Sequence, residues 1–93
     1  MKLRYTERAQ EDLEVAVSWY EKQQLGLGLE FLDSVESSLK GIESSPYMYE
    51  VIHASYRRCL VRRFPFSLFY TIDSDELVIH AVFDNRQDPK KKP

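Results

Sequence analysis

Four arginines stand within a seven-residue stretch of the second half of the chain, beside aromatic side chains. They are Arg57, Arg58, Arg62 and Arg63, and their aromatic neighbours are Tyr56, Phe64 and Phe66. A guanidinium binds phosphate or carboxylate through paired hydrogen bonds and stacks on aromatic rings. The segment from Tyr56 to Tyr70 is therefore expected to bind a nucleic acid or an acidic protein segment. The alternative is that these arginines pair with carboxylates elsewhere in the chain, as exposed charges commonly do.

The net charge of -2 conceals two halves of opposite sign. Residues 1–56 contain five basic and ten acidic side chains, whereas residues 57–93 contain eight basic and five acidic ones. A polyanionic partner is expected to meet the second half, and the acidic first half is expected to be a solvated helical face.

Catalytic groups are scarce. Cleavage of RNA requires a base, an acid and a cation at the scissile phosphate. The arginines can supply the cation, but residues 41–89 contain no lysine and no tyrosine follows Tyr70. Only His53, His80 and carboxylates remain as the base and the acid, so a binding protein is favoured over an enzyme.

The sequence predicts neither a metal site nor a cofactor. Gly26-Leu27-Gly28 lacks the Gly-Lys-Ser/Thr end of a phosphate loop, and there is no His-Glu-x-x-His or Cys-x-x-Cys. Cys59 is the single cysteine, which agrees with a reducing compartment. No apolar run resembles a leader or a membrane span, so a cytoplasmic protein is expected.

Two helices are expected after a short N-terminal strand, Lys2 to Tyr5. Thr6 can cap the first helix, which runs to about Gln23 with apolar residues at helical spacing. These are Ala9, Leu13, Ala16, Val17 and Tyr20. A second apolar stripe, Leu32, Val35, Leu39 and Ile42, ends at Ser44, Ser45 and Pro46. The two helices, joined by a glycine-containing turn, are expected to form an antiparallel hairpin.

The rest of the chain predicts a three-stranded antiparallel meander. Its strands are expected at Tyr56–Arg62, Phe66–Ile72 and Glu76–Phe83, joined by turns at residues 63–65 and 73–75. The fold class is thus α+β, in one domain that spans residues 1–93 and has a flexible polar tail from about residue 85.

The last two strands carry large apolar side chains on both faces, if their residues alternate strictly. Because a helical hairpin covers only one face of a small sheet, Phe69, Val78 and Val82, or the opposite set, require another cover. Two covers are equally plausible at this point. One is a partner protein, and the other is the segment 44–55, which contains Tyr47, Met48, Tyr49, Val51 and Ile52.

An ordered set of residues along nearly the whole chain resembles the RelE/ParE superfamily of bacterial toxins, nearest its ParE branch. The set comprises Ala9, Asp12-Leu13, Trp19-Tyr20, Gly26-Leu27-Gly28, Phe31, Pro46, Tyr56-Arg57, Leu60-Val61, Arg63-Phe64-Pro65-Phe66, Tyr70, Ala81-Val82-Phe83 and Arg86-Gln87-Asp88-Pro89. Its most specific parts are Arg-Phe-Pro-Phe and Arg-x-Asp-Pro.

The resemblance implies a growth-inhibiting toxin of a type II toxin-antitoxin system of the plasmid-stabilisation kind. A cognate antitoxin is expected to wrap the toxin with a helix and an extended segment, giving a hetero-oligomer. ParE-like members poison DNA gyrase, whereas RelE-like members cut messenger RNA on the ribosome. The acidic net charge and the missing lysines and C-terminal tyrosine favour gyrase.

Two alternatives stay open. The first is a ribosome-dependent messenger RNA endoribonuclease, whose candidate catalytic residues are Arg57, Arg62, Arg63, His80 and Arg86. The second is a degenerate binding module without toxicity. It is suggested by Asp84, which stands where many relatives have histidine, and by Lys90-Lys91-Lys92-Pro93, which replaces the usual tryptophan-containing end.

Two sets of binding residues follow. The residues expected to bind the target are Arg57, Arg58, Arg62, Arg63 and Arg86. The residues expected to bind the antitoxin are Trp19, Tyr20, Phe31, Phe69, Val78 and Val82.

Overall fold

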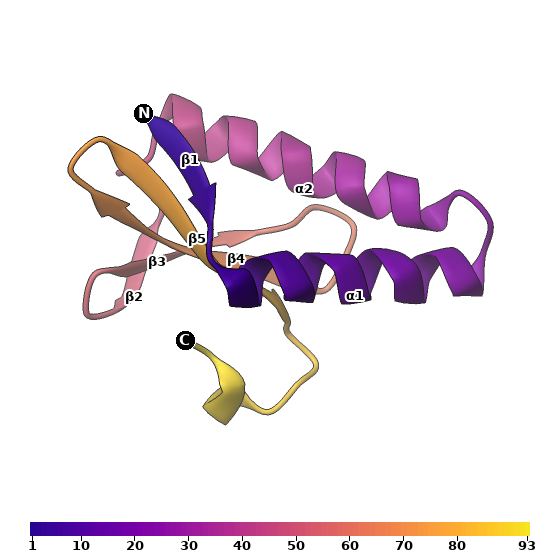
Figure 1. Ribbon diagram of the computed structural model, residues 1–93. Helices are drawn as coiled ribbons and strands as arrows, with labels where there is room; N and C mark the ends of the chain where they lie inside the picture. The colour runs from indigo at the N-terminus through magenta and orange to yellow at the C-terminus, as the bar shows by residue number, and fades with distance from the viewer.

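The computed structural model describes residues 1–93 and contains a helical hairpin packed on one mixed sheet (Figure 1). Its elements are β1 (Lys2–Tyr5), α1 (Glu7–Gln23), α2 (Leu27–Ser44), β2 (Glu50–His53), β3 (Tyr56–Leu60), β4 (Phe66–Asp73), β5 (Glu76–Asp84) and the 3-10 helix η1 (Pro89–Lys91). The α+β class, the N-terminal strand, the helical hairpin and the meander are confirmed. The meander gains one strand that was not predicted, β2, within the segment expected to be a loop.

The five strands lie in the order β1-β5-β4-β3-β2. Strands β2 to β5 run antiparallel to their neighbours, and β1 pairs in parallel with β5, Lys2 opposite Glu76 and Tyr5 opposite Ile79. The first and last strands of the chain are therefore neighbours. This arrangement brings the start of α1, which follows β1 directly, beside the C-terminal half of β5.

The helical hairpin has a tightly built turn. Gly26 adopts a left-handed backbone with φ of 88°, which a side chain disfavours. The Glu21 carboxylate accepts hydrogen bonds from the backbone N–H groups of Gly26 (2.9 Å) and Gly28 (3.0 Å), so it serves the free donors at the start of α2. A Cβ atom on Gly28 would lie 2.7 Å from the carbonyl oxygen of Val17, so the two helices approach closely here.

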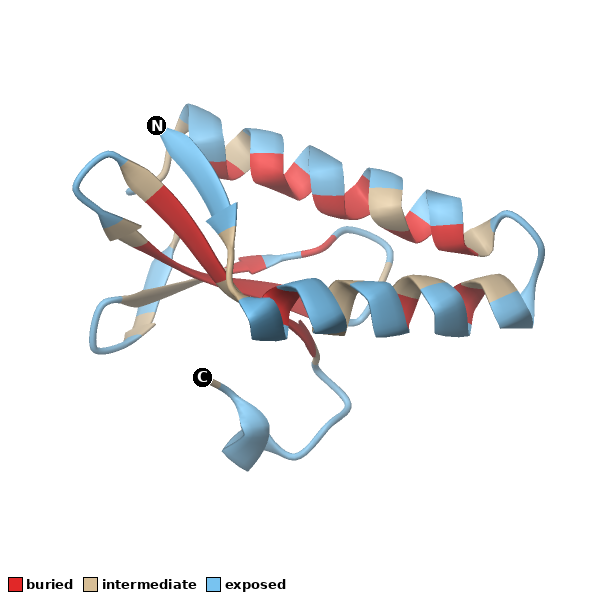
Figure 2. Cartoon of the chain, in the orientation of Figure 1, coloured by how far each residue is buried: buried red, intermediate tan, exposed pale blue.

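The main core lies between the hairpin and one face of the sheet, and the buried sides of both helices face inward (Figure 2). Aromatic rings fill its wide end near the hairpin turn. Tyr20 stacks on Phe31 with centroids 5.1 Å apart, and Phe64 and Phe66 contact both rings edge-on or tilted. The Arg-Phe-Pro-Phe segment thus places Phe66 in the core and the partly buried Phe64 against it, where aromatic pairs add to the free energy of burial.

Strand β5 contains a bulge that reverses its alternation. Phe69 pairs with Ala81 and Tyr70 with Ile79, so His80 is the extra residue. Before the bulge, Leu77 and Ile79 share one face as predicted, and this face packs on the helices. Beyond it, Val82 faces the helices and Ala81 and Phe83 face away, so the strict alternation predicted for this half of the strand is wrong.

The outer face of the sheet has a small aromatic cluster of its own, formed by Phe69, Ala81 and Phe83 and contacted by Ile52 of β2. All three are buried within the chain. Of the two covers left open by the sequence, the segment 44–55 is therefore the one that this chain supplies in part. Part of the segment 44–55 does cover it through Ile52, while Tyr47, Met48 and Val51 remain exposed.

Residues 85–93, expected to be a flexible tail, leave β5 through a turn, form η1 and return toward the start of α1 (Figure 1). The Asp88 side chain accepts a hydrogen bond from the N–H of Lys90 (3.0 Å), and the Lys91 carbonyl accepts one from the Arg8 guanidinium. The polar composition of this segment did not predict such a path.

Candidate functional site

A cleft of about 470 Å³ lies between α1 and the end of β5. One wall is the outer side of α1, and the other is the last part of β5 with the turn that follows. Its lining residues are Arg8, Glu11, Asp12, Val15, Ala16, Trp19, Tyr20, Phe66, Val82, Phe83, Asp84, Arg86 and Gln87. Several pieces of the sequence resemblance, distant along the chain, meet here, and this surface is called the α1–β5 cleft below.

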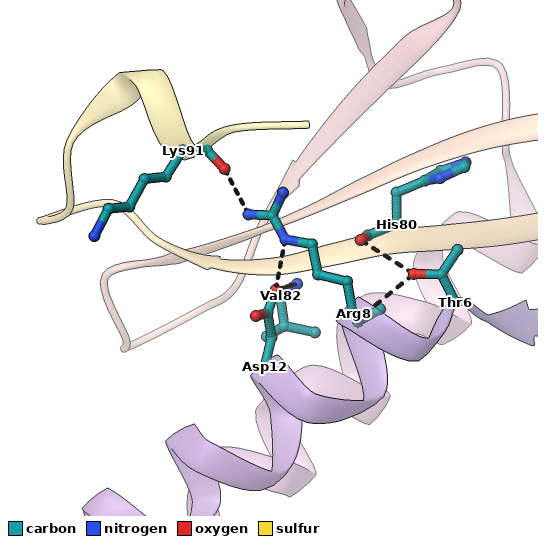
Figure 3. A network of polar contacts seen from close by, with 7 residues as sticks. Thr6, Arg8, Asp12, His80, Val82 and Lys91 are labelled. Atoms are coloured by element: carbon teal, nitrogen blue, oxygen red, sulfur yellow. Dashed lines mark hydrogen bonds and ion pairs between the residues drawn. The ribbon is translucent and has the colours of Figure 1, made fainter.

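Side chains of α1 hold its first turns against the bulge of β5 (Figure 3). The Thr6 hydroxyl caps α1 by accepting from the N–H of Ala9 (3.1 Å) and donates to the carbonyl of His80 (3.2 Å). The Asp12 carboxylate accepts from the N–H of Val82 (3.1 Å) and lies 3.5 Å from the Arg8 guanidinium. The pairing of β1 with β5 ends at Ile79, and Thr6 and Asp12 hydrogen bond to the β5 backbone groups that follow it. These contacts position the floor of the cleft.

Trp19 and Arg86 form the rim of the cleft. The guanidinium of Arg86 lies 5.7 Å from the ring centre of Trp19 and donates to both Asp84 carboxylate oxygens at 2.9 Å. These hydrogen bonds hold the pKa of Asp84 below its ordinary value and raise that of Arg86. Burial raises the pKa of the neighbouring Tyr20. Asp84 thus fixes the orientation of the Arg86 guanidinium and neutralises much of its positive charge.

Trp19 and Val15 expose apolar surface at this cleft. Trp19 is 48% exposed and Val15 69% exposed, although both belong to a helix with a buried apolar stripe. They stand four residues apart, outside that stripe, on the face of α1 that borders the cleft. Val15 was missed as a site residue, and its apolar side chain on the otherwise polar face of the predicted helix was the signal that could have found it.

The four clustered arginines do not form one basic surface. Arg57 donates to the backbone carbonyls of Tyr47 (3.0 Å) and Tyr49 (2.7 Å), whereas Arg58 pairs with Glu50 (2.9 Å). The two lie on opposite faces of the sheet, because successive residues of a strand point in opposite directions. Both guanidiniums therefore bind to the segment that connects α2 to β3, through its carbonyls and through Glu50.

Arg62 and Arg63 occupy the turn between β3 and β4. Arg63 has a left-handed backbone with φ of 71° and pairs with Glu30 of α2 at 2.8 Å. Arg62 is exposed and makes no ion pair. Arg58 and Arg63 thus pair with carboxylates, as the alternative interpretation of the cluster expected. Arg62 is the arginine of the cluster that has no such partner.

His80 lies apart from the arginines. Its Nε2 atom is 2.8 Å from the Thr71 hydroxyl, and its ring meets Tyr56 edge-on with centroids 4.9 Å apart. Burial lowers its pKa, so the imidazole is neutral near pH 7. Arg57, Arg63, Arg86 and His80 have different partners on different elements. Of the candidate ribonuclease residues, only Arg62 and Arg63 share one turn, and no hydrogen bond or ion pair joins His80 to any of the arginines.

Five of the six residues expected to bind an antitoxin are buried within the chain. Phe31, Phe69 and Val78 are at most 1% exposed, and only Trp19 offers a large free surface. Tyr20 and Val82 are buried too, at 7% and 3%, but both line the α1–β5 cleft.

A protein-family model described as the ParE toxin of the type II toxin-antitoxin system parDE matches residues 3–89. The chain belongs to the ParE toxin family. This confirms the resemblance stated from the sequence, including the preference for the ParE branch. No curated protein sequence matches the chain.

The solved structures that share the fold of this ParE-family chain include two that match it over most of their length. One, described as the chromosomal ParDE TA system from P. aeruginosa, has a TM-score of 0.76 and 19% identity and covers 90% of this chain and 95% of its own. The other is the YoeB dimer from Staphylococcus aureus, with a TM-score of 0.62 and 16% identity, covering 88% of this chain and 93% of its own. Neither helix of this ParE-family chain is long and apolar enough to cross a membrane.

Proposed function

We propose that this ParE-family protein is a toxin that acts by binding DNA gyrase and that a cognate antitoxin neutralises it. We prefer binding over catalysis because the candidate catalytic groups already have partners within the chain. Arg57 is committed to backbone carbonyls, Arg86 to Asp84 and His80 to Thr71. No base and acid flank a common free cation, which cleavage of RNA requires.

The α1–β5 cleft is the surface proposed for the antitoxin. Exposed Trp19 and Val15 supply apolar contact area, and the guanidinium of Arg86 lies beside them. Such a combination of an aromatic anchor and an arginine is typical of the energetic centre of protein interfaces. The ParDE system with the same fold supports an antitoxin as the first partner.

The gyrase proposal is tested with purified toxin, relaxed plasmid DNA and gyrase. We expect loss of supercoiling or accumulation of gyrase-cleaved DNA, reversed by an equimolar amount of antitoxin. Supercoiling that continues unchanged at micromolar excess of toxin contradicts the proposal. Rapid growth arrest on expression without antitoxin separates a toxin from a non-toxic binding module, which permits normal growth.

A ribosome-dependent endoribonuclease is the second candidate, and Arg62 is the observation that favours it. This arginine is exposed and unpaired in the basic segment, so it is free to meet a phosphate. Sequencing of RNA 5′ ends after brief induction tests this candidate. Cuts at fixed codon positions support it, and an unchanged pattern of 5′ ends excludes it.

A further inference from the structure

The outer face of the sheet contains aromatic side chains that the helices do not cover. Phe69 and Phe83 meet edge-on with centroids 5.8 Å apart, and Ala81 packs with them. Their exposures are 0%, 2% and 0%, as low as in the main core on the other face. Of the partly buried apolar side chains only Ile52 packs on this outer cluster, so other groups must exclude water from it.

The C-terminal segment contributes to this cover, together with Arg58, the cross-strand neighbour of Phe69. The ammonium nitrogen of Lys92 lies 6.0 Å from the ring centres of both Phe69 and Phe83. A cleft of about 410 Å³ separates Pro89, Lys92 and Pro93 on one side from β2 and Arg58 on the other. The segment therefore crosses the outer face between α1 and β2, on the side of the sheet away from α2 (Figure 1).

Few contacts hold the segment in place, and they lie near solvent. The Arg8 guanidinium donates to the Lys91 carbonyl at 2.6 Å, as Figure 3 shows. The Lys92 ammonium contributes its two ring contacts, and Asp88 caps η1 locally. Exposed contacts of this kind each change an equilibrium by a factor of only about 2 to 10. Opening of the segment therefore requires far less free energy than unfolding of the sheet beneath it.

We propose that residues Asp88–Lys92 form a strap that closes over the Phe69–Ala81–Phe83 cluster and opens to expose it. The closed strap is the occupant of this face in the free protein. Opening exposes a contiguous apolar surface and separates the Lys92 ammonium from the Phe69 and Phe83 rings. A partner that uses the outer face must first displace the strap, so the strap regulates access to this face, which borders the α1–β5 cleft at Phe83.

The proposal is tested on the unmodified protein through the ε-methylene protons of Lys92. Protons above an aromatic face are shielded, so their NMR resonances should lie upfield of those of Lys90, whose side chain contacts no ring. In Phe69→Leu and Phe83→Leu variants this shielding should decrease while the Lys90 resonances stay in place. Lys92 and Lys90 resonances at the same position overturn the closed strap.

A second test compares dye binding after replacement of two lysines of this segment, each of which removes one positive charge. Lys92→Ala should raise the binding of the apolar dye ANS roughly twofold or more, because the cluster becomes accessible. Lys90→Ala is the matched control and should leave dye binding at the wild-type level. Deletion of residues 88–93 should raise dye binding furthest, with unchanged far-UV circular dichroism. Wild-type dye binding in the folded deletion variant shows that no strap covers the cluster.

Discussion

At the residue scale, one carboxylate of α1 contacts the backbone of β5 directly beyond the bulge. Asp12 accepts the N–H of Val82, a buried residue that is 3% exposed, at 3.1 Å. Asp12→Ala leaves this donor unsatisfied, so we expect the free energy of unfolding to fall by about 1–3 kcal/mol. Asp12→Asn retains an acceptor oxygen and should lose less. Urea unfolding measures both.

Glu11→Ala is the matched control for the Asp12 variants. Glu11 lines the same cleft and is exposed, and its side chain makes no hydrogen bond or ion pair. We expect its replacement to change the unfolding free energy by less than about 0.5 kcal/mol. Equal losses in Glu11→Ala and Asp12→Ala contradict the role given to the Val82 contact.

His80 makes stability depend on pH. Burial lowers the pKa of its imidazole, with a smaller lowering by Arg4 and an opposing effect of Asp73, while Thr71 and Tyr56 contact the ring. The unfolded chain binds a proton near its ordinary pKa of about 6.5, and the native chain does so only at lower pH. Stability is therefore complete above this pKa and decreases as pH falls through the window below it.

The pH dependence is measured by urea unfolding between pH 7.5 and pH 5, values chosen to span the ordinary imidazole pKa of about 6.5. His80→Gln should flatten the decrease in the unfolding free energy, because glutamine cannot titrate yet can still hydrogen bond to Thr71. His53→Gln changes an exposed histidine and should preserve the decrease. An unaltered slope in His80→Gln assigns the pH dependence to other groups.

The sequence identified the arginine cluster but could not show its surroundings. Arg63 meets Glu30 across 33 positions of the chain, and Arg57 meets carbonyls of the connection before β2. Such pairings depend on which segments the fold brings together, which local spacing does not encode. The Asp84–Arg86 pair is local, but its stacking on Trp19 likewise requires the tertiary fold.

At the element scale, the predicted helices and long strands agree with the structure because their apolar periodicity is strong. The second helix ends at Ser44 as predicted, and the strand starts at Tyr56, Phe66 and Glu76 are the predicted ones. Strand β2 was missed because it is short, lies at the edge and is mostly exposed, so no alternation marks it. The bulge was missed because its side-chain contacts come from Thr6 and Asp12, more than sixty residues away.

The two glycines of the helical hairpin are needed for different reasons, which predicts different costs of substitution. Gly28→Ala places a methyl group 2.7 Å from a backbone carbonyl of α1, so the helices must separate. We expect a loss of about 1–3 kcal/mol in the free energy of unfolding. Gly26→Ala has open space around the new methyl group and should cost only the backbone strain of about 1–2 kcal/mol.

Thermal unfolding monitored by circular dichroism measures both variants, and the near-ultraviolet signal separates the two causes. Gly28→Ala should change this signal, because the aromatic core beside the hairpin must repack around the displaced helices. Gly26→Ala should leave it as in the wild type. A native-like aromatic signal and unchanged stability in Gly28→Ala contradict the close approach of the helices.

At the scale of the whole molecule, the opposite charges of the two halves meet across the fold. Arg63 of the basic half pairs with Glu30, and Arg58 pairs with Glu50. The basic segment is thereby less available to a polyanion than its composition indicates. The α1–β5 cleft instead joins residues of both halves, and no single segment of the sequence could predict it, although Trp19 and Arg86 were separately identified as candidates.

The geometry of this cleft predicts how much Trp19 contributes to antitoxin affinity. Trp19 is 48% exposed, and both Tyr20 and Arg86 hold its ring in position, so little conformational entropy remains to be lost on binding. Trp19→Ala should weaken antitoxin binding by about 2 kcal/mol or more, roughly 30-fold in Kd, because a pre-oriented tryptophan is a typical anchor. Isothermal titration calorimetry with purified antitoxin measures this loss.

Leu25→Ala is the control that separates a specific anchor from exposed apolar surface in general. Leu25 is 91% exposed in the hairpin turn and does not line the α1–β5 cleft. Its replacement should leave the Kd within about twofold of the wild-type value, since peripheral contacts contribute little to affinity. If Leu25→Ala weakens binding as much as Trp19→Ala does, the antitoxin covers the hairpin turn as well. If only Leu25→Ala weakens it, the interface lies at the turn and the cleft is left free for another partner.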